Sequence, residues 1–262
     1  MRVSVLTARF AALALVGLTL LATGAATRAE PAYPEEAAAV TTLTLEPNGS
    51  QPVALAVNSS TSRIYVANAG SDNVSVVDGA SSTVIATIPV GPTPRGIAVD
   101  AGANRVYVAS SGSNEVTVID GGSNEVAATL PVGKDPWGIA ADPNTGRVFV
   151  SNRGSGTVSV IDGRHNLRLA TVAVGDLPTA VAVNPDTGRV YVASSGSGDL
   201  GVIDGRSNLL LATLPLAGDS SVEAWDVAVD SSSNRVYVAT SAAEASDADG
   251  GTVLVIDGSN NS

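Results

Sequence analysis

The 262-residue sequence predicts an all-β fold, a β-propeller of four-stranded blades, and three observations support this prediction. A marker of the type Arg-apolar-aromatic-Val begins at Arg63, Arg105, Arg147 and Arg189, at intervals of 42 residues, and again at Arg235. A second marker, Val-Asp-Gly or Ile-Asp-Gly, follows each first marker. Short β-branched runs alternate with clusters of Gly, Asn, Asp and Ser, which are typical of strands and turns. A period of about 40–50 residues with several strands per unit indicates a propeller blade.

One unit accounts for four strands. Residues 96–99, 105–110, 116–119 and 126–132 are the expected strands, and the segments between them are turns. The first strand carries a small residue at its centre in every unit, which suits close approach of the innermost strands: Ala56, Ala98, Ala140, Ala182 and Ala228.

The two ends of the repeat region complement each other. The last unit stops after its third strand, 253–257, and an unmatched strand, 42–45, precedes the first unit. We expect the N-terminal strand to pair into the last blade, which covers an exposed edge and closes a ring of five blades. A place in a larger ring is the alternative.

The N-terminus is typical of export. Arg2 and Arg9 lie before and at the start of an apolar run, 10–26, and Thr27-Arg28-Ala29 forms a small-x-small cleavage pattern. Residues 1–29 are therefore interpreted as a signal peptide, with a retained anchor as the alternative. Residues 30–40 are expected to be a flexible leader, and 41–262 a single propeller domain. The expected location is extracytoplasmic: periplasmic, cell-surface or secreted.

Composition limits the partners. Residues 1–29 hold three arginines and no acid, so the remaining chain has 14 − 3 = 11 basic and 25 acidic residues and a net charge of −14. This charge repels phosphate backbones and argues against nucleic acid as a partner. The absence of cysteine excludes disulfides, thiolate metal sites and cysteine nucleophiles. We expect a monomer that does not insert into a membrane once the signal is removed.

The repeated segments also resemble a known family. IYVAN, VYVAS and VFVSN, followed by VSVIDG and ATLPVG, resemble the YVTN-type propeller repeat over nearly all of residues 41–258. The resemblance implies a propeller outside the cytoplasmic membrane, as in bacterial and archaeal surface-layer and exported proteins, most of them without assigned chemistry. The chain departs from common members in having five units instead of six or seven.

Residues that recur in every unit are expected to serve the blade. Asp in each Asp-Gly turn accepts backbone hydrogen bonds, and the repeated arginine pairs with turn carboxylates or carbonyls. His165, the only histidine, is expected in an exposed turn.

Departures from the repeat are more informative. Insertions fall in 218–225 and 241–251, in connections that should emerge on one face beside the last blade. Their carboxylates are candidate ligands for Ca²⁺, with a solvated acidic loop as the alternative: Asp219, Glu223, Glu244, Asp247 and Asp249.

The equivalent loops of other blades share that face. Trp137 and Trp225 occupy matching places just before the first strand of their blades, where they could stack on a ligand or pack on the next blade. The candidate residues for binding a ligand or partner are Trp137, Trp225, Arg95, Lys134, Asp135, Arg153 and Asp176.

The sequence leaves catalysis open and favours a non-enzymatic role. The first hypothesis is an exported binding module that presents one loop face to a protein, peptide or glycan of the cell envelope. The alternative is a metal-assisted hydrolase or lyase with an acidic site at the channel mouth. A surface-layer or scaffold part without a small ligand is the third. No cofactor is firmly indicated, and Ca²⁺ is the one considered.

Overall fold

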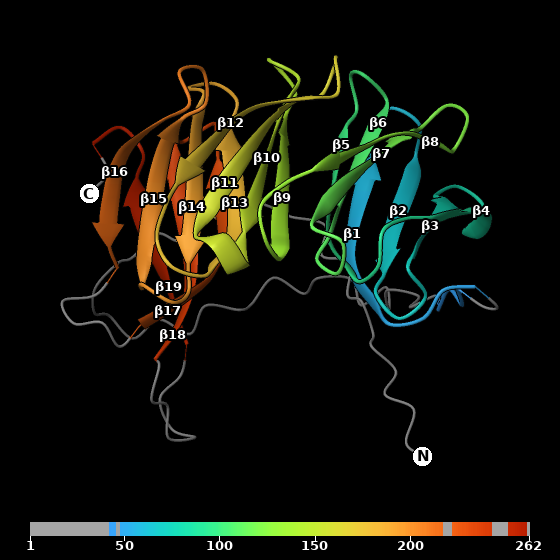
Figure 1. Cartoon of the computed structure of the whole chain (residues 1–262), viewed down its shortest axis with the longest axis horizontal. Coiled ribbons are helices and arrows are strands. Elements are labelled where there is room, and N and C mark those ends of the chain that lie inside the picture. The colour runs from blue at the N-terminus through green and yellow to red at the C-terminus, as the bar shows by residue number, and fades with distance from the viewer. Residues whose placement is uncertain (1–41, 46–47, 217–221, 243–250, 261–262) are drawn as a thin grey trace, which may run out of the picture. The chain divides into compact units, whose positions relative to one another are not determined.

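The computed structural model of the chain describes residues 42–45, 48–216, 222–242 and 251–260. The chain divides into two units, Met1–Thr44 and Leu45–Ser262, and the second contains every described strand. These strands form five antiparallel sheets, coloured in chain order in Figure 1. The described residues include no helix long and apolar enough to span a membrane.

Each sheet is a meander whose strands follow one another in the chain. Sheet 1 contains β1 (Pro52–Asn58), β2 (Arg63–Asn68), β3 (Asn73–Asp78) and β4 (Thr83–Pro89). Sheet 2 contains β5 (Pro94–Asp100), β6 (Arg105–Ser110), β7 (Glu115–Asp120) and β8 (Glu125–Pro131). Sheet 3 contains β9 (Pro136–Asp142), β10 (Arg147–Asn152), β11 (Thr157–Asp162) and β12 (Leu167–Ala173), with the short 3₁₀ turn η1 (Arg153–Ser155) between β10 and β11. Sheet 4 contains β13 (Pro178–Asn184), β14 (Arg189–Ser194), β15 (Asp199–Asp204) and β16 (Leu209–Pro215). Sheet 5 contains β17 (Val222–Asp230), β18 (Arg235–Ala242) and β19 (Thr252–Asp257). The all-β fold and the five predicted blades are confirmed.

The middle strands of sheets 2 to 4 are buried on both faces because each of these sheets lies between two others. In β7, Val116 and Val118 point to one face and Thr117 and Ile119 to the other, and all four are buried. Successive first strands pack side by side, β1 on β5, β5 on β9, β9 on β13 and β13 on β17. Four hydrophobic clusters result, one at each junction between consecutive sheets.

The expected closing strand is not formed. Residues 42–45 are not in a strand, and sheet 5 has three strands within the described residues. The amide of Gly49 donates to the carbonyl of Leu45 at 2.9 Å. The side chain of Asn73 in β3 then donates to the carbonyl of Asn48, which ties the chain to sheet 1. The local bonds therefore favour the first sheet over the last.

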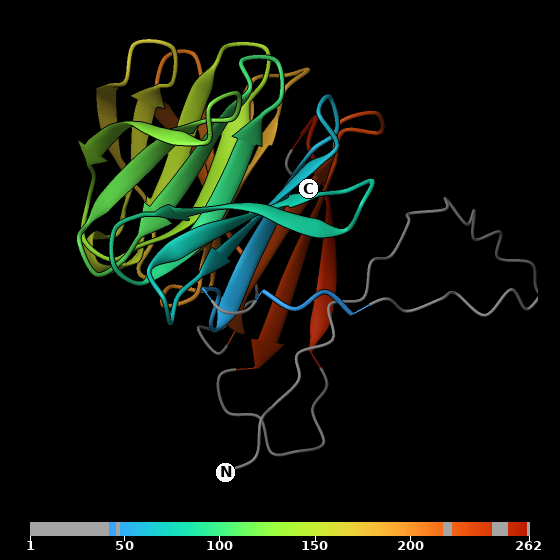
Figure 2. The same cartoon turned by 90° about the vertical axis from the view of Figure 1, so that its right-hand side faces the viewer.

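Sheets 1 and 5 do not pack on each other in the described structure as consecutive sheets do. No hydrophobic cluster joins them, and β1 and β17 lack the packing that links the other neighbouring first strands. In Figure 1, β1 stands on the right and β17–β19 at the lower left; Figure 2 shows the same strands from the side, in blue and red. Val53, Leu55 and Val57 of β1 and Val253 and Val255 of β19 are exposed, whereas Ser75 and Val77 of β3 are buried.

Candidate functional site

Two kinds of connection meet at one face of the sheets, as the sequence predicts. In sheets 1 to 4, the turn between the second and third strands donates two backbone hydrogen bonds to the loop that precedes the first strand. In sheet 3 the amides of Arg153 and Gly154 donate to the carbonyls of Asp135 and Lys134, at 2.8 and 2.9 Å. We call this surface the loop face: residues 48–51, 69–72, 90–93, 111–114, 132–135, 153–156, 174–177 and 195–198.

A β-bulge recurs at the start of every first strand and positions one residue per sheet next to the loop face. A bulge re-aims the side chain that it contains. The residues at this repeat position are Val53, Arg95, Trp137, Thr179 and Trp225. Trp137 and Trp225 therefore occupy matching places, but inside β9 and β17 and not just before them.

Trp137 is the centre of a cluster that joins two sheets. The guanidinium carbons of Arg95 and Arg153 lie 4.7 and 5.2 Å from the centroid of its ring, within the range of cation–π attraction. Nη1 of Arg153 also lies 3.7 Å from a carboxylate oxygen of Asp135. Nε of Arg95 and Nε of Arg153 are buried and have no hydrogen-bond partner among the described residues. The stack therefore fixes both guanidinium groups and leaves part of their donor capacity unused.

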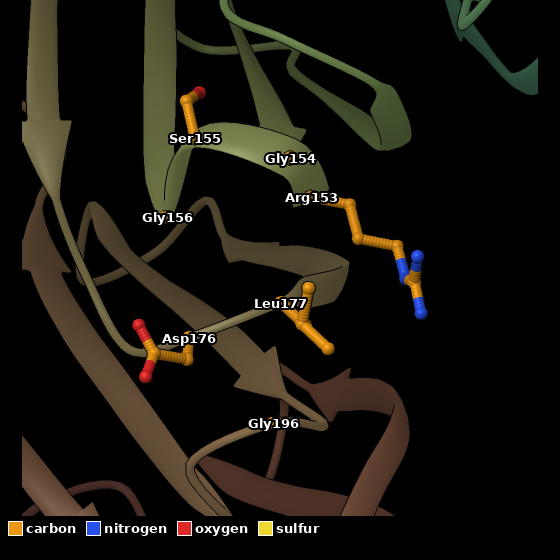
Figure 3. A pocket seen from close by; sticks show the side chains of 7 residues that line it. All are labelled: Arg153, Gly154, Ser155, Gly156, Asp176, Leu177 and Gly196. Atoms are coloured by element: carbon orange, nitrogen blue, oxygen red, sulfur yellow. The ribbon is translucent and has the colours of Figure 1, made fainter.

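An open hollow of about 540 Å³ borders this cluster. Figure 3 shows it between η1 and the loop before β13, with the guanidinium of Arg153 on one side and the carboxylate of Asp176 on the other. Leu177 adds an apolar surface, and Ser155 also lines the hollow, although its hydroxyl is bonded to the amide of Lys134 and the hydroxyl of Thr157. A cation, an anion and an apolar side chain around one hollow suit a polar ligand that carries some apolar surface.

Five of the seven predicted binding residues are thus brought together. Arg95, Asp135, Trp137 and Arg153 form the cluster, and Asp176 borders the adjoining hollow. Lys134 is an exposed neighbour on the same loop. Trp225 lies apart in sheet 5, where its Nε1 donates to Oγ of Ser241 at 2.9 Å and its side chain is exposed.

The predicted calcium ligands fall mostly outside the described residues. Asp219, Glu244, Asp247 and Asp249 are not described, and Glu223 is a partly buried residue of β17. Among the residues that the structure describes, no three His, Cys, Asp or Glu side chains gather in a way that could hold a metal ion.

The repeated arginine serves the blades. Nη1 of Arg63, Arg105, Arg147 and Arg189 donates to the carbonyl of the Asp-Gly turn in the next sheet, at Gly121, Gly163, Gly205 and Gly258 respectively. Each such bond ties one sheet to its successor on the side away from the loop face. These arginines are therefore structural.

The repeated aspartates hold their own turns. The amides of Ser123 and Gly122 donate to the carboxylate of Asp120 at 3.0 and 2.8 Å, which lowers the pKa of that carboxyl below its ordinary value. In Asp162 the hydrogen bond with the exposed His165 side chain, at 2.8 Å, is the largest cause of the lowered pKa. The carboxylates of the repeated aspartates therefore accept hydrogen bonds within their own turns.

Leu177 and Ser155 are site residues that the sequence analysis missed. Leu177 stands at the loop position that Gln51, Thr93 and Asp135 occupy in the other sheets. All four have positive φ, 48° at Leu177, a conformation that is costly for a side chain of this kind. The other sheets have a polar residue at this turn position, so comparison of the repeats could have identified the apolar residue at 177 as unusual.

Comparisons with known proteins support the fold. No family model and no curated protein matches this chain. A solved chain of Kuenenia stuttgartiensis hydrazine synthase matches with a TM-score of 0.70 at 21% identity, over 80% of this chain and 64% of that one. A functionally unknown protein from Desulfotomaculum acetoxidans DSM 771 matches with a TM-score of 0.63 at 17% identity, over 73% of this chain and 65% of that one. This chain therefore spans slightly less than two thirds of the solved chains that it matches, and its fold is propeller-like.

Proposed function

We propose that this chain is an exported, non-enzymatic propeller module of the YVTN type that binds a protein, peptide or glycan of the cell envelope through its loop face. The signal-like pattern of residues 1–29 and the repeat resemblance support export. The cluster around Trp137 and the hollow beside it support binding at the loop face.

One observation carries the proposal: Arg153 belongs both to the Trp137 cluster and to the wall of the hollow. Its guanidinium is held by the indole ring and by Asp135, so little side-chain freedom remains to be lost when a ligand binds. About a third of the side chain, 31%, is exposed. A preordered, partly exposed guanidinium next to a hollow is suited to donate hydrogen bonds to a carboxylate or to several hydroxyl oxygens of a ligand.

The distribution of basic residues adds to this. Outside the signal segment the chain has eleven basic residues. Only three of them stand at the loop face or its bulges, and all three lie in sheets 2 and 3: Arg95, Lys134 and Arg153. The chain is acidic as a whole, and the positive charges of its loop face therefore lie together beside the hollow.

The test is isothermal titration of the purified protein with a defined panel: soluble peptidoglycan fragments, neutral β-linked glucan oligosaccharides and short acidic peptides. We expect at least one probe to bind, and Trp137→Ala or Arg153→Ala to remove about 1–3 kcal/mol of its binding free energy. Arg168→Ala is the matched control, because Arg168 is exposed on β12 away from the loop face.

Retention of full affinity by both cluster variants would contradict the proposal, as would a panel in which nothing binds. Mass spectrometry of each probe after incubation, with and without Ca²⁺, separates binding from turnover. A cleaved probe would favour the hydrolase or lyase alternative over a non-enzymatic module.

A further inference from the structure

One buried polar position next to the loop face differs between alternate sheets. In sheet 3, Asn152 ends the second strand, and Thr157 lies opposite it at the start of the third strand. The side-chain amide of Asn152 donates to the hydroxyls of Thr157 and Ser159, at 3.1 and 3.0 Å. In sheet 1 the amide of Asn68 makes the same two bonds. The asparagine therefore supplies the hydrogen bonds that the buried oxygens around it require.

Sheets 2 and 4 combine two changes at this position. Ser110 and Ser194 replace the asparagine, and the residues opposite them in the strand register are Glu115 and Asp199. The donor amide is thus absent in the two sheets that have a carboxylate here. Neither carboxylate forms an ion pair with another described side chain. A partly buried carboxylate that lacks this donor favours another source of positive charge.

In sheet 4 the buried oxygens at this position lack partners. Ser194 is 0% exposed, and neither its hydroxyl nor Oδ1 of Asp199 has a hydrogen-bond partner among the described residues. The two side chains lie on one face of the sheet, because they are opposite each other in the register. A Cβ atom on Gly175 would overlap both carboxylate oxygens of Asp199 and Oγ of Ser197. The carboxylate and this second hydroxyl therefore converge above the backbone of a glycine.

Sheet 2 repeats the arrangement. The hydroxyls of Ser110 and Ser113 are buried and have no hydrogen-bond partner within the described part of the chain, and Ser110 is 0% exposed. A Cβ atom on Gly91 would overlap Oε1 of Glu115, Oγ of Ser113 and Cβ of Ser110. Ser113 lacks the loop amide that its counterparts receive in sheets 1, 3 and 4, because Pro92 has no amide hydrogen.

We infer that sheets 2 and 4 each bind one small hard cation, Ca²⁺ or Na⁺, at this position. Carboxylate and hydroxyl oxygens suit such cations, which keep water as their remaining ligands. Sheets 1, 3 and 5 need no cation, because the asparagine amides, or the paired hydroxyls of Thr240 and Thr252 at 2.7 Å, satisfy the equivalent oxygens. The protein ligands are one carboxylate and two hydroxyls in each sheet: Asp199, Ser194 and Ser197 in sheet 4, and Glu115, Ser110 and Ser113 in sheet 2.

The cation site of sheet 4 adjoins the hollow of the loop face. Gly175 precedes Asp176 and Leu177, which line the hollow (Figure 3), and Oγ of Ser197 accepts the amide of Asp176 at 2.9 Å. A cation held by Asp199 and Ser197 therefore ties this loop to β15. Each site has a single carboxylate, so we expect the weak affinity of extracellular calcium modules, with a dissociation constant of about 0.1–1 mM. The inference does not depend on which ligand enters the hollow.

The test is thermal unfolding of the purified protein after treatment with a chelator and dialysis into choline chloride. CaCl₂ or NaCl then replaces choline at constant ionic strength. A ligand that binds only the folded state stabilises it according to its saturation. We expect the midpoint to rise by about 3–6 °C per site at an about tenfold excess of the cation over its dissociation constant. The cation that acts at the lower concentration is the one the sites prefer.

Variants of sheet 4 separate cation binding from a general salt effect. Asp199→Asn removes the charge, and Ser194→Asn with Asp199→Thr gives sheet 4 the neutral pair that sheet 3 has. Both should lose about half of the rise, because the site in sheet 2 remains. The double variant should also be at least as stable as the wild type in choline, since an amide replaces the cation. Asp186→Asn, in the exposed turn between β13 and β14, is the matched control and should keep the whole rise.

Calorimetric titration with the preferred cation gives the number of sites. We expect two cations per chain in the wild type, one in Asp199→Asn, and none when Glu115→Gln is added. Near-ultraviolet circular dichroism checks that each variant is folded, and Ser194→Asn with Asp199→Thr replaces Asp199→Asn if the single variant is not.

Two results would overturn the inference. The first is a midpoint that is no higher in Ca²⁺ or Na⁺ than in choline, in which case the serine hydroxyls bond to the carboxylates themselves. The second is a rise that persists in full in Glu115→Gln with Asp199→Asn, because the cation would then bind elsewhere on the chain.

Discussion

The guanidinium carbon of Arg95 lies 4.7 Å from the centroid of the Trp137 ring, and the two residues occupy the same repeat position in consecutive sheets. Both stand in a β-bulge at the start of a first strand. The contact therefore crosses from sheet 2 to sheet 3 directly beside the loop face. The same contact thus stabilises the junction between sheets 2 and 3 and holds the Arg95 and Trp137 side chains of the candidate site in place.

Removal of this contact should destabilise the fold modestly. Arg95→Ala is expected to lower the free energy of unfolding by about 0.5–2 kcal/mol, the range for a cation–π pair between exposed and desolvated limits. Denaturant unfolding measures it. Arg168→Ala should stay within about 0.5 kcal/mol of wild type, as exposed substitutions do; an equal loss in both variants would show that the stack contributes nothing.

The arginine bridges between sheets should matter according to position. Arg105→Ala removes a charged donor from the carbonyl of Gly163 and is expected to cost about 1–3 kcal/mol of unfolding free energy. Arg235→Ala removes an exposed arginine of sheet 5, the last sheet that the structure describes, and should cost less than about 0.5 kcal/mol. Equal losses, measured by thermal and denaturant unfolding, would mean that Arg235 has a partner in solution.

Equivalent apolar positions should differ in the same way. Ile97→Ala is expected to cost about 2–5 kcal/mol, since Ile97 is buried in the cluster between sheets 1 and 2. Leu55→Ala at the matching place should cost less, because Leu55 is 44% exposed, whereas Ile97 is 8% exposed. The difference in unfolding free energy at low protein concentration is the measurement, and similar costs would point to a closed ring.

Acid should destabilise the fold through its turn carboxylates. Hydrogen bonds from the hydroxyls of Ser232 and Ser233 are the largest causes that lower the pKa of Asp230 from 3.8 to about 2. A carboxyl with a depressed pKa stabilises the folded state above its unfolded pKa and loses that contribution as the pH falls through the folded value. The denaturant concentration at the unfolding midpoint should therefore decrease as the pH is lowered from about 4 to about 2. Asp230→Asn should make this decrease smaller. An unchanged slope in the variant would remove Asp230 as a cause.

The repeat made most of the fold predictable. The 42-residue interval from Arg63 to Arg189 indicates that each unit folds into the same set of strands and packs on its neighbours in the same way. The order of the strands, the positions of the turns and the face shared by the two kinds of loop follow from this repetition. Strand limits differ by one or two residues: the expected strand 96–99 extends over Pro94–Asp100, since the bulge lets Pro94 pair with Ser110.

The ends and the site were less predictable, for physical reasons. The sequence of residues 42–45 favours a strand but does not determine its partner, and in the structure these residues form no strand. The stack of Arg95, Trp137 and Arg153 depends on side chains from three segments, so the sequence could nominate its members but not their contacts. Arg63 and its repeats bond to the next sheet, a contact that a single repeat does not contain.

The most direct test of the proposed binding site uses Trp137 as its own reporter. The chain has two tryptophans, so Trp225→Phe leaves Trp137 as the only one, and its emission can be followed while the tightest-binding probe of the panel is added. We expect a saturable change in emission that matches the calorimetric affinity and is lost in Trp225→Phe with Arg153→Ala, but kept with Arg168→Ala. A probe that binds by calorimetry without changing the emission of Trp137 would contradict the account, because the ligand would then bind away from this cluster.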